Sequence, residues 1–167
     1  MTVFKPIIAD TYQFYETDSL EHLEMLQEKD YRYINSIHFS LAKVNRDKLG
    51  DITIIDNSML LAFSERATNI FKSAGKFLKL QDTDDYSLLD APIINALDYE
   101  KSIIDYFAGT QQLKRIRKYF FNTQVIKEID AFTLPIQGSP VFVTDTFVEK
   151  YKVNGYNGLD FYIVFSE

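Results

Sequence analysis

The sequence contains no cysteine, no tryptophan and only two histidines among its 167 residues. Without cysteine the chain has no disulfides, no thiolate metal ligands and no cysteine nucleophile, which is typical of a reducing compartment. No apolar run approaches the roughly 18–20 residues that cross a bilayer, and the N-terminus lacks the basic flank and long apolar segment of a secretory signal. We therefore expect a cytoplasmic protein with no membrane partner.

The two histidines also lack the companions that metal chemistry needs. His22 lies between glutamates in segment 21–24, and His38 lies between apolar residues. Neither a His-Glu-x-x-His motif nor a paired cysteine motif is present, and glycine-rich phosphate loops and Gly-x-Ser-x-Gly elbows are absent as well. The sequence predicts no catalytic residue, no cofactor and no metal. A hydrolase built on dispersed carboxylates is the enzymatic alternative, because acid–base pairs need no fixed spacing.

The composition is that of a folded globular protein with an excess of acidic residues. Hydrophobic residues make up 46% of the chain and charged residues 25%, which excludes the disordered class. The length favours a single domain spanning residues 1–167. The net charge of −6 disfavours nucleic-acid binding, because phosphates are repelled. The same charge would attract a basic protein partner. A contribution to solubility alone is the alternative explanation.

Hydrophobic patterns and helix caps predict an α+β fold, with a mostly antiparallel or mixed sheet and a few flanking helices. The apolar run 3–9 is interrupted by Pro6, which predicts an edge strand because proline cannot donate to a ladder. Asp18 or Ser19 is placed to cap a helix that ends near Glu28.

The clearest local pattern lies in residues 139–161. Thr144 is placed to cap a helix whose first residue, Asp145, suits the positive end of the helix dipole, and Gly155 is placed to end that helix. A closing strand follows. Folding explains each of these features, so the stretch marks no active site.

The chain also resembles itself at a constant offset of 80 residues, from segment 52–75 to segment 132–155. Without a gap, Ser64 meets Thr144 and Gly75 meets Gly155. Each segment predicts a strand, a hairpin and a capped helix. Recurrent caps and stops explain part of this similarity, and we favour an internal duplication over coincidence.

Acidic residues between the two copies are the candidate partner-binding residues. Asp82, Asp84 and Asp85 cluster in one stretch, and Asp98 and Glu100 follow in a predicted turn. The first cluster lacks the glycine and the glutamate that an EF-hand needs at its sixth and twelfth positions, which disfavours calcium. A solvated loop is the alternative interpretation.

A short basic run at residues 114–118 precedes three aromatic residues. Aromatic side chains beside basic ones favour stacking on nucleic-acid bases. Because the whole chain is acidic, we interpret this run as the solvated edge of a strand or helix.

Three segments carry a resemblance to a known family: 140–151 (Pro-Val-Phe-Val-Thr-Asp-Thr-Phe-Val-Glu-Lys-Tyr), 155–161 (Gly-Tyr-Asn-Gly-Leu-Asp-Phe) and 94–102 (Ile-Asn-Ala-Leu-Asp-Tyr-Glu-Lys-Ser). They resemble a family of bacterial immunity proteins, long catalogued as a domain of unknown function and encoded beside polymorphic toxins. With the weaker copy at Ser64-Glu65, the resemblance covers roughly residues 50–165. The N-terminal third carries little of it and lacks the tryptophans expected there.

The resemblance implies a non-catalytic protein that neutralises an antagonistic toxin, delivered by cell contact or by a secretion system, through a stoichiometric complex. It supplies no catalytic residues. If the toxin is a nuclease, carboxylates that mimic phosphate suit its basic cleft. The five acidic residues named above are then the first candidates for contact. A plain scaffold or accessory subunit is a further alternative.

Overall fold

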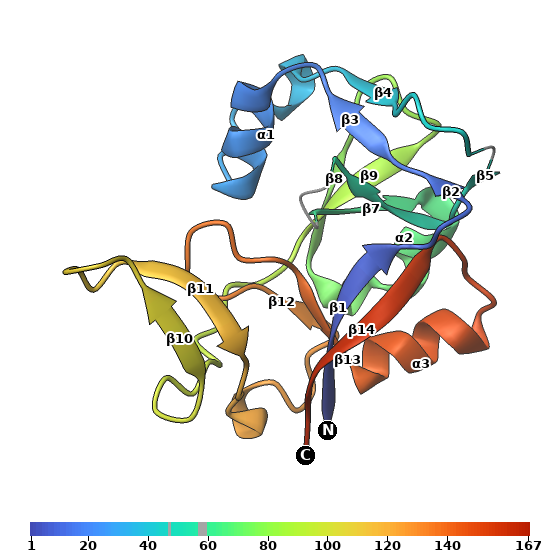
Figure 1. Ribbon diagram of the computed structural model, residues 1–167. Helices are drawn as coiled ribbons and strands as arrows, with labels where there is room; N and C mark the ends of the chain where they lie inside the picture. The colour runs from blue at the N-terminus through green and yellow to red at the C-terminus, as the bar shows by residue number, and fades with distance from the viewer. Residues whose placement is uncertain (47, 57–59) are drawn as a thin grey trace.

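The protein is organised around two larger sheets in a computed structural model that describes residues 1–46, 48–56 and 60–167 (Figure 1). The four-stranded sheet has the order β12-β13-β1-β14 and pairs the chain's two ends, with Thr2 opposite Ser166. Its strands are β1 (Thr2–Ile8), β12 (Ala131–Phe132), β13 (Phe142–Thr144) and β14 (Leu159–Ser166). All of its pairings are antiparallel.

The six-stranded sheet has the order β4-β3-β6-β7-β9-β8 and is mixed, since β3 and β6 are parallel and its other pairs antiparallel. Its strands are β3 (Tyr15–Thr17), β4 (Phe39–Leu41), β6 (Ile52–Ile55), β7 (Leu60–Ser64), β8 (Lys76–Lys79) and β9 (Tyr86–Asp90). Two further pairs stand apart: parallel β2 (Tyr12–Gln13) with β5 (Lys48–Leu49), and antiparallel β10 (Ile103–Tyr106) with β11 (Leu113–Lys118). The expected α+β class is confirmed.

The helices begin where the sequence places caps, although one cap works differently. They are α1 (Leu20–Gln27), α2 (Glu65–Ile70) and α3 (Asp145–Val153), with short 3-10 turns at Ile34–Ser36, Lys72–Ala74 and Thr123–Val125. The Ser19 and Ser64 side chains accept from backbone N–H groups of their helices. Thr144 occupies the cap position of α3, but its buried hydroxyl donates to the Ile129 carbonyl at 2.7 Å instead.

The prediction of an N-terminal edge strand is wrong, because β1 lies between β13 and β14. Proline is tolerated there for a local reason. Strand β13 pairs only with Val3 and Phe4, whereas Pro6 lies further along, opposite Phe161 of β14. The missing N–H therefore costs no bond to β13.

Both segments of the proposed duplication follow the order strand, antiparallel strand, helix. Their registers differ by one residue: Ile52 pairs with Phe63, whereas Phe132 pairs with Phe142 and not with Val143. Residues 57–59 of the first copy lie outside the described part of the chain. Common origin of the two segments stays a prediction.

The main core joins the helices of the two segments. Phe71, which follows α2, and Phe147 of α3 have ring centroids 4.3 Å apart, and both contact Phe63 of β7. A second cluster lies under α1 around Leu26, and a third surrounds Phe121 and Phe142. Ile104 and Ile116 anchor the β10–β11 hairpin on this third cluster, and most of its other strand side chains are exposed.

Candidate functional site

A groove runs between α1, the β10–β11 hairpin and the connection from β12 to β13, residues 133–141. Four adjoining cavities form it, and all four are lined by Ile136 of this connection. In Figure 1 the connection rises between α1 and the hairpin. Gln137 Nε2 donates to Glu28 Oε1 at 3.1 Å, which links the floor of the groove to the end of α1.

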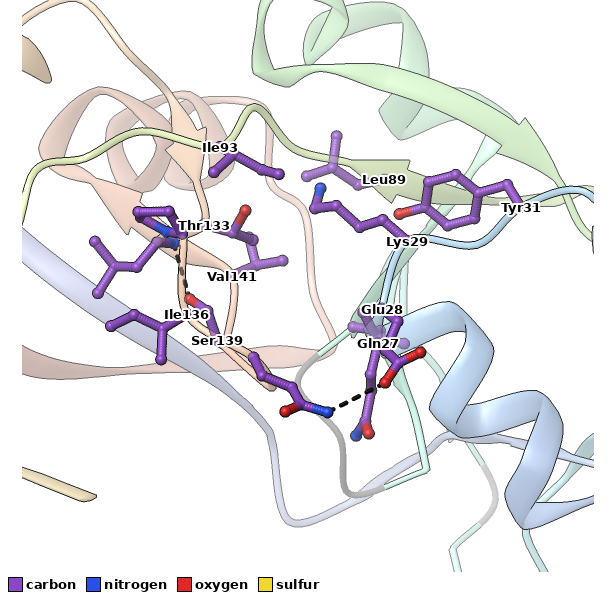
Figure 2. A pocket seen from close by; sticks show the side chains of 14 residues that line it. Gln27, Glu28, Lys29, Tyr31, Leu89, Ile93, Thr133, Ile136, Ser139 and Val141 are labelled. Atoms are coloured by element: carbon purple, nitrogen blue, oxygen red, sulfur yellow. Dashed lines mark hydrogen bonds between the residues drawn. The ribbon is translucent and has the colours of Figure 1, made fainter. Parts of the chain in front are cut away.

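The end of the groove nearest the six-stranded sheet is a cavity of about 290 Å³ with mixed lining (Figure 2). Leu89, Ile93 and Val141 supply apolar surface, while Lys29 and Tyr31 lie on the opposite side from Ile136.

Several polar groups around this cavity already bond to the protein. Lys29 Nζ lies 2.7 Å from Asp90 Oδ1 and 2.6 Å from the Ala91 carbonyl, and the Tyr31 hydroxyl donates to the same carboxylate at 3.2 Å. Burial and the Asp90 charge raise the pKa of Tyr31 far above its ordinary value, so the phenol stays protonated. The Ser139 hydroxyl accepts from Leu134 N–H and donates to the Pro140 carbonyl. The acceptor of the Ser139 hydroxyl is a backbone carbonyl, which is no base, and the carboxylate beside the Tyr31 hydroxyl is already paired with Lys29.

Residues elsewhere in the described chain add no catalytic arrangement. His22 and His38 lie at the surface, paired with Asp18 and Asp82. No group of three His, Asp or Glu residues within the described ranges could hold a metal ion. The one carboxylate there that is almost fully buried, Asp130, is bonded to Lys150 and to the Ser73 hydroxyl. The buried carboxylate is thus already paired within the protein.

The structure separates the five sequence-predicted acidic residues into two groups. Asp82, Asp84 and Asp85 lie exposed in the loop between β8 and β9, next to the cluster beneath α1. Asp82 pairs with His38 at 2.5 Å and Asp85 with Lys79 at 2.5 Å. Asp84 makes no side-chain ion pair within the described residues, so it is the carboxylate of this loop most open to a partner.

Asp98 and Glu100 lie in the turn before β10, at the other end of the molecule from that loop (Figure 1). Asp98 is half-buried and accepts from Lys101 N–H, and its second oxygen lies 2.9 Å from Lys101 Nζ. This pairing holds the pKa of Asp98 below its ordinary value. Glu100 is exposed, and the residue between the two, Tyr99, lines the hairpin end of the groove. Of the two groups, only this one lies beside the groove.

Sequence reasoning missed the groove, although it interpreted the basic run beside the groove correctly. Residues 114–118 do form a solvated strand edge, as interpreted, but they belong to a hairpin that stands apart from both large sheets. Tyr106 and Phe107 at the end of this hairpin are 48% and 47% exposed. The sequence feature that could have revealed the hairpin was the spacing of Ile104 and Ile116. These two residues anchor the hairpin to the core, while most of its other side chains are exposed.

Residues 91–165 match the model of the Imm11 immunity protein family. The match covers a little under half of the chain and confirms the expected resemblance over these residues. It includes the β10–β11 hairpin and the floor of the groove, whereas α1 lies outside it. A search of curated proteins found no match. No helix within the described residues is long and apolar enough to cross a membrane.

Proposed function

We propose that this protein is an immunity protein that neutralises a cognate bacterial toxin by stoichiometric binding in the cytoplasm. The match of residues 91–165 to an immunity protein family is the observation that carries the proposal. The groove supports it, because its floor and one wall are built from the matched residues and its polar groups are arranged for contact rather than for catalysis. The whole chain, residues 1–167, acts as the inhibitory unit.

We propose further that carboxylates contact a basic surface of the toxin, as a nuclease cleft would present. Asp82, Asp84 and Asp85 form the first candidate patch, and Asp98 with Glu100 the second. Electrostatic steering by an acidic patch raises the association rate towards a basic partner and makes it dependent on salt.

A rescue assay tests the function. The protein is expressed in cells that also make the toxin encoded beside its gene, and growth is compared with cells that lack the protein. We expect growth to be restored and the two proteins to co-purify in a fixed molar ratio. Restored growth without a complex, together with turnover of a substrate, would favour the hydrolase alternative. Absence of both rescue and binding would refute the immunity function.

A further inference from the structure

One cavity of the groove has a charged lining that consists only of cations. This cavity of about 420 Å³ lies between β11, β1 and the connection 133–141. Its charged lining consists of Lys5, Lys114 and Arg115, and no Asp or Glu lines it. The surrounding hairpin, residues 103–118, carries four cations and one carboxylate, a net charge of +3 within a chain of net charge −6. The hairpin is therefore locally cationic within an acidic chain.

Two of the three cations lack an anionic partner. Arg115 is held by Asp105 at 2.6 Å. Lys5 and Lys114 make no ion pair with any described residue, although Lys114 Nζ lies 5.9 Å from the centre of the Phe107 ring. Lys5 is half-buried, and this burial lowers its pKa. A half-buried, unpaired ammonium is unfavourable, and an incoming carboxylate would relieve that cost.

The rest of the groove continues this cavity in two directions. Towards the hairpin tip, Tyr99 and Tyr106 line an apolar and aromatic extension, each 48% exposed. Towards α1, the lining becomes acidic through Glu24 and Glu28. A ligand that fills the groove thus meets exposed aromatic rings, then unpaired cations, then carboxylates.

We propose that the groove binds an extended acidic segment of the toxin, with a carboxylate between Lys5 and Lys114 and apolar side chains on Tyr99 and Tyr106. Exposed tyrosines favour a protein partner, because Tyr is enriched at protein–protein interfaces. Nucleic acid is disfavoured, since the net charge of −6 repels phosphates outside this one patch. Glu24 and Glu28 repel acidic residues at the far end and so fix the direction of the segment. The identity of the partner rests on the proposed function, whereas the chemistry of the groove does not.

Charge reversal at one lysine, with a matched control on the same strand, tests this inference. Lys114→Glu changes a groove cation, and Lys118→Glu makes the same change at an exposed strand residue that lines none of the groove cavities. We expect Lys114→Glu to weaken toxin binding about tenfold or more and Lys118→Glu to change it less than about threefold. Thermal melting of both variants checks that they stay folded.

The possible results distinguish failure of the groove inference from failure of the proposed immunity function. If the wild type rescues cells and Lys114→Glu binds the toxin as tightly as Lys118→Glu, the groove inference is overturned and the immunity function stands. If the wild type binds no toxin, the function fails, and a labelled octapeptide of alternating Glu and Leu tests the groove alone. Tighter binding of this peptide than of its Lys-Leu counterpart, lost in Lys114→Glu, supports the inference. Equal or tighter binding of a twelve-residue thymidine oligonucleotide through Lys114 overturns it in favour of nucleic acid.

Discussion

Lys150 Nζ lies 2.6 Å from Asp130 Oδ2, whose side chain is 2% exposed. The pair connects α3 to the residue before β12, and the Ser73 hydroxyl donates to the same oxygen. The two copies of the proposed duplication are therefore joined by a buried polar contact as well as by the Phe71–Phe147 packing.

We expect replacement of Lys150 to lower the free energy of unfolding more than replacement of Asp130 does. Lys150→Met leaves a buried carboxylate without its cation, which costs about 3–5 kcal/mol of unfolding free energy. Asp130→Asn costs less, about 1–2 kcal/mol, because Lys150 is 34% exposed and can turn to water. Urea unfolding of the two variants measures the difference, and equal losses would contradict it.

The two glycines aligned by the repeat are expected to respond very differently to alanine. Gly155 lies at φ +65 and ends α3 by bonds from its own N–H to Lys152 and from Tyr156 N–H to Tyr151, with open space where a Cβ would stand. Gly155→Ala should cost about 1 kcal/mol, the strain of a left-handed backbone.

At Gly75 the constraint is contact with a neighbouring strand. A Cβ there would clash with the backbone carbonyl of Asp90 in β9, and α2 has already ended at Ile70. We expect Gly75→Ala to cost about 3 kcal/mol or more. The melting temperatures of the two variants check this expectation. A larger decrease in melting temperature for Gly155→Ala than for Gly75→Ala would contradict it and would show that the backbone around Gly75 can shift. Gly75 ends the short 3-10 turn Lys72–Ala74 and not α2, so its aligned role as a helix stop holds only for that turn.

These glycines show what the sequence could predict. The stop at Gly155 and the cap at Ser19 depend on residues within a few positions, and both were correctly predicted. The role of Gly75 depends on its contact with Asp90, and that of Thr144 on its bond to Ile129. Both partners lie outside the local sequence patterns, which therefore could not reveal these roles.

The candidate site also combines features that nearby residues determine with features that depend on residues far apart in the sequence. Exposure of Asp82, Asp84 and Asp85 was correctly predicted, because a run of carboxylates between two strands has nowhere to be buried. The groove was not predictable, since Lys5 and Lys114 are 109 residues apart and line one cavity only because the hairpin packs on the third hydrophobic cluster. The family resemblance, which the match over residues 91–165 confirms there, gave no location for a binding surface.

The surface pair of His38 and Asp82 predicts a measurable pH dependence. Its hydrogen bond and charge interaction raise the pKa of His38 above 6.5. The folded state therefore gains stability from the pair below pH 6.5 and loses it as the pH rises through the raised pKa. NMR titration should find the pKa of His38 elevated in the wild type and near its ordinary value in Asp82→Asn. An unchanged His38 pKa in that variant would rule out Asp82 as the cause.

Charge reversal in the loop between β8 and β9 tests the acidic patch independently of the groove. The combined variant Asp82→Lys, Asp84→Lys, Asp85→Lys should slow association with a basic toxin by about tenfold at low salt, because steering is lost, and the difference should shrink as salt screens it. A second variant reverses Asp98 and Glu100, the other candidate patch, in the turn before β10 beside the groove. Stopped-flow association rates at two salt concentrations give the comparison. If the loop variant and the wild type associate equally fast at low salt, the loop carries no contact. If only the variant with Asp98 and Glu100 reversed associates more slowly, the toxin docks through this second patch, next to the hairpin.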